Sequence, residues 1–535
     1  MPKDPPRKED GPQTVLQLPR MFLSQDEVRI TEDYNVGTFL EALADRKFSA
    51  ERAIDAFCHR AALAHQLTNC LTEPLFKQAL QRARFLDRYL EEHGSTFGPL
   101  HGLPVSVKDT LDIEGFDSST GLAALCYKPA KRNAPLINLL TSLGAVIVAK
   151  TNVPQSLGSL DSINNVFGRT MNPINRLCTA GGSSGGEGVM VAMRGSMVGI
   201  GSDLGGSIRI PAMANGVYGF RPSTTKLPYD GQAALVPEGM DGLGVQPVVG
   251  PLARTIDDID TVMKHLVLRA GLWGRDCMAS GWASAKTGVQ GSGRNGEIII
   301  GVLRNDGNCS LLPPIDQVLS EVVSTLQNNS TFDVVEIPTP AAWTQAQEIM
   351  AELISIDGAE RMGKLLEVMQ EPLVPWMQPR FRTKEPSSLA KVAELQTRRA
   401  ELEKEMLEIW SEVDDYGRKN RKIDAIICAV APHPVPEIDK WGTLNYTSVW
   451  NLFDYPAGTI PVRNVVEEDL LLGQQLDSKS LGSWDDACRD LWDERLLDRK
   501  VYLNTPLSVQ VVSPRGEDDR LCKVLMLIDG VIKGC

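Results

Sequence analysis

Apolar residues recur at helical spacing through most of the first 95 residues of the chain. A stripe over positions 54–63 follows Ser49, a residue type that is common at helix N-caps. A second stripe over 75–90 stops at Gly94, and glycine often ends a helix. We therefore predict that this part of the chain is mostly helical, after an N-terminal tail over residues 1–35.

From position 101 onwards, short β-branched runs alternate with helical stretches. The runs at 105–107 and 145–148 predict buried strands, and the stretch at 136–143 predicts a helix. The same criteria predict further elements: strands at 297–303, 425–430, 459–462 and 509–512, a helix with one apolar stripe at Leu389–Trp410, and loops at 279–296 and 371–388. This alternation is typical of the α/β class.

Composition narrows the class of protein and of partner. The chain has 535 residues, of which 42% are hydrophobic and 23% are charged, as in ordinary globular proteins. The 55 basic and 68 acidic residues give a net charge of −13 without a basic block, which argues against nucleic acid as a partner. Ten scattered cysteines without a CxxC spacing indicate a reducing compartment. Because no apolar stretch has the length of a membrane span, we predict a cytoplasmic protein.

The segment over residues 181–209 carries the strongest functional signal. Two clusters of glycine and serine enclose the apolar runs 189–193 and 197–200. A flexible connector would not carry these runs, because their side chains favour burial. We interpret the glycine clusters as turns that lead into a buried helix and then a buried strand. Glycine also lets a substrate approach the backbone closely, so we expect an active site here.

The residues leave two candidate serine mechanisms open. The string at 182–186 satisfies the GxSxG pattern of nucleophile elbows, which would make Ser184 the nucleophile and would require a later histidine such as His265 or His433 as base. Alternatively, Lys108 closes the strand at 104–108 and could be the base, provided that burial depresses its pKa.

Sites for phosphates and metals are not predicted. The glycines near position 200 lack the third glycine of a dinucleotide fingerprint, and the sequence has no GxxxxGK[ST] string. His, Cys, Asp and Glu do not occur at the spacing of metal ligands. We therefore expect neither a cofactor nor a metal.

Several longer strings resemble one known family. HGLPVSVKDT, AKTNVPQS, GGSSGGEG, GSDLGGSIRIP, YGFRPS and DYPAGTIPV together resemble the amidase signature family over about residues 50–515. The helical lead-in is most similar to fungal acetamidases, and the central blocks also resemble fatty acid amide hydrolases. The resemblance implies one large α/β domain over 36–535, with a mixed, many-stranded sheet covered by helices and a signature core at about 100–225.

The resemblance also implies roles for individual residues. It makes Ser207 the nucleophile, Ser183 a bridging serine that follows a cis peptide bond, and Lys108 the base. The expected oxyanion hole consists of the backbone N–H groups of Leu204, Gly205, Gly206 and Ser207. The expected supporting residues are Ser184, Asp203 and Arg209, of which Asp203 and Arg209 should pair with each other.

The implied reaction is hydrolysis of a small-molecule amide to a carboxylate and ammonia or an amine, through an acyl-enzyme. Three alternatives stay open: a serine esterase, a hydrolase of fatty or aryl amides with the same fold, and a non-catalytic member or subunit of a transamidating complex. A homodimer is also compatible with the sequence. We expect the acyl pocket to include residues 350–354 and 446–455, where Trp450, Leu452 and Phe453 supply apolar bulk.

Overall fold

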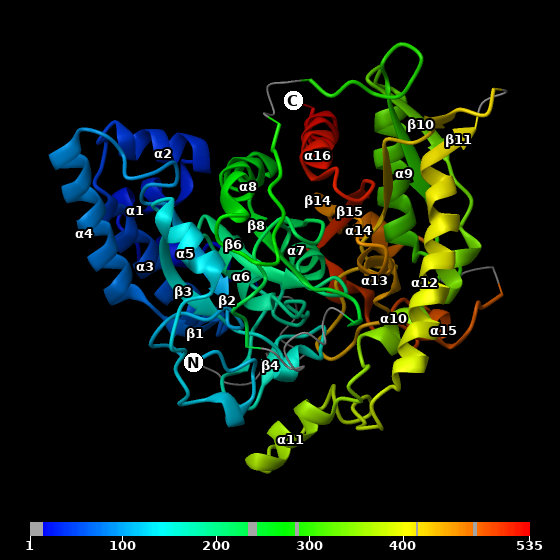
Figure 1. Ribbon diagram of the computed structural model, residues 1–535, viewed down its shortest axis with the longest axis horizontal. Coiled ribbons are helices and arrows are strands. Elements are labelled where there is room, and N and C mark those ends of the chain that lie inside the picture. Colours follow the sequence, from blue (N-terminus) through cyan, green and yellow to red (C-terminus); the bar gives the residue numbers. More distant parts are fainter. Residues whose placement is uncertain (1–13, 234–242, 284–287, 414–415, 474–478, 535) are drawn as a thin grey trace.

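The computed structural model describes residues 14–233, 243–283, 288–413, 416–473 and 479–534 (Figure 1). An eleven-stranded sheet runs through the molecule, in the order β1-β3-β2-β6-β8-β7-β14-β15-β13-β9-β10. Its strands are β1 (Leu71–Pro74), β2 (Pro104–Lys108), β3 (Val146–Thr151), β6 (Val198–Asp203), β7 (Tyr218–Arg221), β8 (Val248–Ala253), β9 (Ile298–Leu303), β10 (Phe332–Glu336), β13 (Ala425–Ala429), β14 (Ala457–Asn464) and β15 (Pro506–Val512).

The sheet is mixed, as expected. Strand β2 pairs in parallel with β3 and β6, and Val107 lies opposite Lys150 on one side and Ile200 on the other. Strands β8, β7, β14 and β15 pair in antiparallel order. The six strands on the β1 side come from residues 71–253 and the five on the other side from residues 298–512, so the halves of the chain meet between β7 and β14.

In the described part of the chain, sixteen helices surround this sheet. They are α1 (Gln25–Glu32), α2 (Val36–Ala44), α3 (Ala50–Thr68), α4 (Phe76–His93), α5 (Pro135–Ser142), α6 (Gly185–Ala192), α7 (Arg209–Asn215), α8 (Ile256–Ala270), α9 (Pro313–Gln327), α10 (Ala341–Leu353), α11 (Glu360–Val368), α12 (Leu389–Trp410), α13 (Asn445–Leu452), α14 (Glu467–Leu470), α15 (Ser483–Asp490) and α16 (Asp518–Lys533). Helices α1–α4 lie at one end of the molecule and α12 at the other (Figure 1).

The elements that the apolar pattern predicted are present in the structure. Helix α3 begins directly after Ser49, whose side chain accepts a hydrogen bond from the N–H of Arg52, as a cap should. Helix α4 ends at Gly94, which adopts a left-handed conformation. Helix α12 has the two ends that the sequence predicts. All of the predicted strands are present and belong to the one large sheet.

The N-terminal segment is more ordered than a tail. Residues 1–13 lie outside the described part, but Leu18–Met21 forms a 3-10 helix and α1 follows within the same predicted tail. Ser24 and Glu27 form a capping box at the start of α1, and Ile30 is buried in the main core. The sequence prediction missed this helix because α1 is short and only its Ile30 and Thr31 are buried.

Candidate active site

The ends of two neighbouring parallel strands bring the candidate residues together. Lys108 is the last residue of β2 and Asp203 the last of β6, and these strands are paired. Carboxyl ends of adjacent parallel strands lie at the same edge of a sheet, where α/β proteins commonly bind ligands. Ser183 lies just before α6 and Ser207 in the turn between β6 and α7, which we call the 203–208 turn.

Lys108 is buried and lies among hydroxyl groups. Its Nζ donates a hydrogen bond to Ser183 Oγ at 2.7 Å and another to Ser202 Oγ at 2.8 Å. Burial lowers the pKa of Lys108 to about 7, although the carboxylates of Asp203, Glu187 and Asp109 oppose this shift. A substantial fraction of the amine is therefore neutral near pH 7 and able to accept a proton.

Glu187 is a second buried titratable group in this region, and the sequence analysis gave it no role. It lies in the first turn of α6, and its carboxyl accepts hydrogen bonds from Ser106 Oγ at 2.5 Å and Thr151 Oγ1 at 2.6 Å. Burial raises the pKa of Glu187 to about 8, against these hydrogen bonds and the charge of Lys108. Its presence within GGSSGGEG, as the one acid among glycines and serines, is the signal that could have identified it.

The first glycine–serine cluster is packed tightly against the rest of the site. The peptide bond between Gly182 and Ser183 is cis, as the family resemblance implies. A Cβ atom on Gly182 would lie 2.5 Å from the carbonyl oxygen of Ser159, so no larger residue fits there. The N–H of Ser184 donates to the carbonyl of Ser207 at 3.2 Å. This bond joins the two glycine–serine clusters.

The 203–208 turn presents backbone N–H groups beside a partly exposed Ser207. The N–H groups of Leu204, Gly205 and Ser207 have no hydrogen-bond partner among the residues that the structure describes. The N–H of Gly206 differs from the sequence expectation, because it donates to Asp203 Oδ1 at 2.7 Å. This hydrogen bond stabilises the turn. Three of the four expected N–H groups therefore remain as candidate hydrogen-bond donors to an oxyanion.

Asp203 and Arg209 form a fully buried ion pair that fixes the turn from beneath. Arg209 donates to both carboxylate oxygens of Asp203, each at 3.1 Å. Burial favours the neutral acid, but the charges of Arg209 and Arg221 hold the pKa of Asp203 well below its usual range. Asn451 donates to Asp203 Oδ1 at 2.9 Å and accepts from Arg209 at 2.6 Å. This network orients the turn, and Asn451 was not identified from the sequence.

The structure places Ser184 and His433 in structural positions. Ser184 is buried, and its Oγ exchanges hydrogen bonds with the backbone of Ser202. Both ring nitrogens of His433 are engaged, with the carbonyl of Pro434 and the N–H of Gly442, and its ring packs edge-on against Trp441. Burial lowers the pKa of His433 to about 4. The arrangement thus offers no serine–histidine pair at Ser184.

The residues expected to shape the acyl pocket form a wall behind the turn. Met350, Leu353, Trp450, Leu452 and Phe453 belong to one buried cluster, and the partly buried Leu204 packs against it. Trp450, Leu452 and Phe453 are completely buried in this cluster, and their place in an acyl pocket stays a prediction. Through Leu204, the cluster as a whole packs against the 203–208 turn.

Gly206→Ala should impair both the turn and catalysis. Gly206 has a φ of +125°, and an added Cβ would lie 2.3 Å from Thr447 Oγ1. We expect kcat to fall roughly 100-fold, about the effect of losing one oxyanion donor, with a lower Tm. Gly205→Ala is the matched control, since its Cβ would meet only Ser448 Cβ at 3.8 Å and should leave Tm unchanged. Unchanged kcat and Tm in Gly206→Ala would contradict this account of the turn.

Three further observations concern ligands, disulfides and membranes. Within the described ranges, three or more His, Cys, Asp and Glu side chains do not gather as metal ligands would. The nine cysteines in those ranges are free thiols, and Cys535 lies outside them. Among the helices of the described residues, none combines the length and apolarity that crossing a membrane demands.

Comparison with known proteins gives one consistent match. The family model described as Amidase matches residues 52–522. An amidase from Gibberella moniliformis is 34% identical, over 96% of this chain and 90% of the relative. An acetamidase from Emericella nidulans is 32% identical, over 95% of this chain and 91% of the relative. A solved structure of a fatty acid amide hydrolase superposes with a TM-score of 0.86 at 28% identity, covering 98% of this chain and 89% of that one.

Proposed function

This chain belongs to the amidase family and is an amide hydrolase, and we propose that Ser207, Ser183 and Lys108 carry out its reaction. The observation that carries the proposal is the 2.7 Å hydrogen bond between Lys108 Nζ and Ser183 Oγ. It joins a buried amine, with a pKa near neutrality, to the hydroxyl of Ser183, and the next residue, Ser184, is hydrogen-bonded to the backbone of Ser207.

The first half of the reaction is acylation of Ser207. Neutral Lys108 accepts a proton from Ser183 Oγ while Ser183 accepts one from Ser207 Oγ, which attacks the amide carbonyl. The developing oxyanion accepts hydrogen bonds from the N–H groups of Leu204, Gly205 and Ser207. The tetrahedral intermediate then collapses, and the proton held by Lys108 returns through Ser183 to the leaving nitrogen. Ammonia or an amine departs, and the acyl group stays on Ser207 as an ester.

The second half is hydrolysis of that ester. Water takes the place of the departed amine and attacks the ester carbonyl, giving a proton to Ser183 while Ser183 passes its own proton to Lys108. The same N–H groups donate hydrogen bonds to the second oxyanion. Collapse of this tetrahedral intermediate releases the carboxylate, and the proton returns from Lys108 through Ser183 to Ser207 Oγ, which restores the Ser207 hydroxyl. Lys108 begins and ends the cycle as a neutral amine, so the reaction needs no other base.

The substrate class is drawn from the relatives and from the site together. Curated relatives of nearly the same length include acetamidases, which supports a primary aliphatic amide as the first substrate to test. Fatty and aryl amides and esters suit the same residues and are the alternatives. A cytoplasmic location, a homodimer and the extent of the domain over 36–535 stay predictions.

The pH dependence follows from the pKa of Lys108. The lowered value of about 7 means that the amine is neutral above this pH and protonated below it. Only the neutral amine is a base, so kcat/KM should be level above about pH 7 and fall about tenfold for each pH unit well below it. Ammonia release from short primary amides between pH 5 and 9 measures this profile. A rate that stays level down to pH 5, as a base with the pKa of about 4 of His433 would give, would point to another base.

A further inference from the structure

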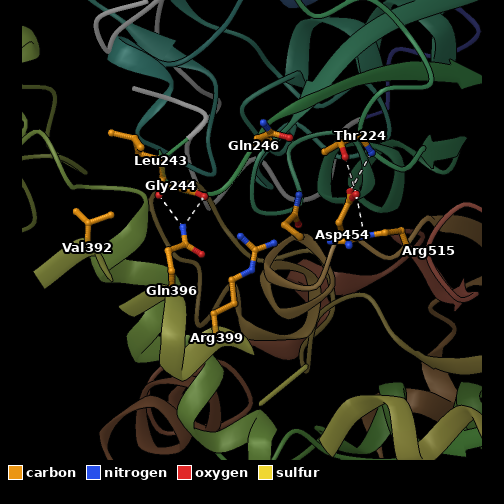
Figure 2. Close-up of a pocket in the computed structure, with 10 residues that line it drawn as sticks. Thr224, Leu243, Gly244, Gln246, Val392, Gln396, Arg399, Asp454 and Arg515 are labelled. Carbon is orange, nitrogen blue, oxygen red and sulfur yellow. Dashed lines mark hydrogen bonds and ion pairs between the residues drawn. The ribbon is translucent and has the colours of Figure 1, made fainter. Parts of the chain in front are cut away.

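A cavity of about 350 Å³ lies beside the candidate active site, at the same edge of the sheet. Thr224 follows β7 and Gln246 precedes β8, while α12 contributes Gln396 and Arg399. Its volume is within the usual range for sites of small ligands. Figure 2 shows Arg399 rising from α12 toward the space between Gly244, Gln246 and Asp454.

The cavity shares a wall with the 203–208 turn. Asn451 lines the cavity, and the same side chain donates to Asp203 and accepts from Arg209. Val392, another lining residue, belongs to the apolar cluster against which Leu204 packs. Only β8 separates β6 from β7 in the sheet, so their ends are roughly 10 Å apart at the usual strand spacing. An extended chain gains roughly 1.2 Å per bond, so a substrate of about eight carbon atoms spans such a distance.

Arg399 is the positive charge that this cavity leaves without a close counter-ion. Asp454 pairs with Arg221 at 2.8 Å and with Arg515 at 3.3 Å, and it also accepts from Thr224. Arg399 forms no ion pair with any residue in the described ranges, and it is only partly exposed. Burial lowers the pKa of its guanidinium, which Glu403 and Asp454 offset only in part. A half-buried guanidinium in this state favours a carboxylate ligand, which it can bind through two parallel hydrogen bonds.

Neighbouring side chains hold the cavity open around this charge. Gln396 donates to the carbonyl of Leu243 at 2.6 Å and so ties α12 to the segment before β8. Leu243 and Val392 supply apolar surface, and Arg515 adds a second guanidinium. The lining therefore suits a short chain of methylene groups that ends in a carboxylate.

We propose that this cavity binds a carboxylate at the far end of the substrate, so that the preferred substrates are monoamides of dicarboxylic acids. The inference rests on the proposed function, because it assigns the amide end of the molecule to Ser207. Arg399 is then a specificity-determining residue that binds the substrate and takes no part in bond breaking.

The test compares two series of amides of equal length. Monoamides of the four- to eight-carbon diacids, from succinamate to suberamate, are set against the neutral amides from butanamide to octanamide. We expect kcat/KM for the best monoamide to exceed that of its neutral counterpart at least tenfold. Arg399→Gln should lower it about 10- to 100-fold, mainly through KM, the loss expected for a charged hydrogen-bonded contact. Arg399→Lys should retain part of the preference, and neutral amides should be hydrolysed equally by all three proteins.

Lys404→Gln is the matched control, since it removes one positive charge from an exposed position of the same helix. It should leave the preference intact. A preference for neutral amides in the unchanged enzyme, or a monoamide preference that survives in Arg399→Gln, would overturn the proposal. The free diacid separates a substrate subsite from an effector site: competitive inhibition supports the subsite, and non-competitive inhibition contradicts it.

Binding separates a failure of this proposal from a failure of the proposed function. Calorimetric titration of the Ser207→Ala protein with the monoamides needs no turnover. Binding that Arg399→Gln abolishes supports the carboxylate site even if no amide is hydrolysed. Binding that is absent, or unaffected by Arg399→Gln, overturns it, whatever the enzyme does to neutral amides.

Discussion

Ser207→Ala should lower kcat/KM for amides by about 10⁴-fold or more, in a protein that folds normally. The proposed acyl-enzyme forms on Ser207 Oγ, so its removal takes away the group that attacks, and losses of this size follow removal of a serine nucleophile. Ser207 is partly exposed at the end of the 203–208 turn, and alanine fits there without a clash. Amide turnover, measured as ammonia release, reports the loss, and an unchanged Tm confirms that the fold is kept.

Covalent labelling checks the same prediction without a known substrate. A serine-reactive fluorophosphonate should modify the unchanged protein at Ser207, located by peptide mass spectrometry, and leave Ser207→Ala unlabelled. Ser184→Ala is the matched control, because Ser184 Oγ is buried and bound to the backbone of Ser202. It should keep most of the activity. An adduct on Ser184 would contradict the assignment of the nucleophile.

Lys108→Met should lower kcat by about 10³-fold or more and also remove the dependence on a group of pKa about 7. Methionine has a similar length and apolar stem, so it keeps the packing while it removes the base. Without the amine, the proton of Ser183 has no acceptor at 2.7 Å. The loss should appear in kcat rather than KM, because the base acts in the transition state. Steady-state rates between pH 5 and 9 measure both effects.

His433→Ala tests the competing histidine base under the same conditions. The His433 ring is buried against Trp441, so the variant should lose stability but keep its rate per folded molecule and its pH profile. If His433→Ala is the more damaging to kcat and Lys108→Met nearly silent, the lysine mechanism is wrong. Thermal unfolding of both variants separates loss of structure from loss of chemistry.

Periodicity alone located the elements that carry a clear apolar stripe. Helix α12 shows this well, because its apolar stripe defines where the helix begins and ends. Strand β2 is an example within the candidate site. The alternation of side chains along a strand places Ser106 and Lys108 on one face, and both side chains contact residues 183–187. The candidate nucleophile, bridging serine and base were identified by family resemblance, and the residues by themselves left a histidine alternative open.

Contacts between distant parts of the chain explain what the sequence could not predict. The N–H of Gly206 donates to Asp203, whose carboxylate is held by Arg209 and by Asn451 from the other half of the chain. Arg399 is one of many charged residues of α12, and nothing in the sequence distinguishes it from the others. Its special surroundings arise only when Asn451 and Asp454 pack beside it. Neither arrangement leaves a periodic pattern.

The two sides of the sheet, divided between β7 and β14, are synthesised one after the other. All residues proposed to act on the amide lie before position 210, in the half of the sheet that the ribosome completes first. Several further bonds that hold the 203–208 turn come from the later half, where Thr447 donates to the carbonyl of Gly205, and Asn451 and Gln510 contact Arg209.

Synthesis proceeds from the N-terminus, and a domain generally folds as a unit. A nascent chain that ends before Gln510 therefore contains Ser183, Ser207 and Lys108 but lacks part of the contacts that orient the 203–208 turn. Hydrolytic capacity arises late in biogenesis, when the second half docks onto the first, and unfinished or truncated chains should be chemically silent towards the amides around them.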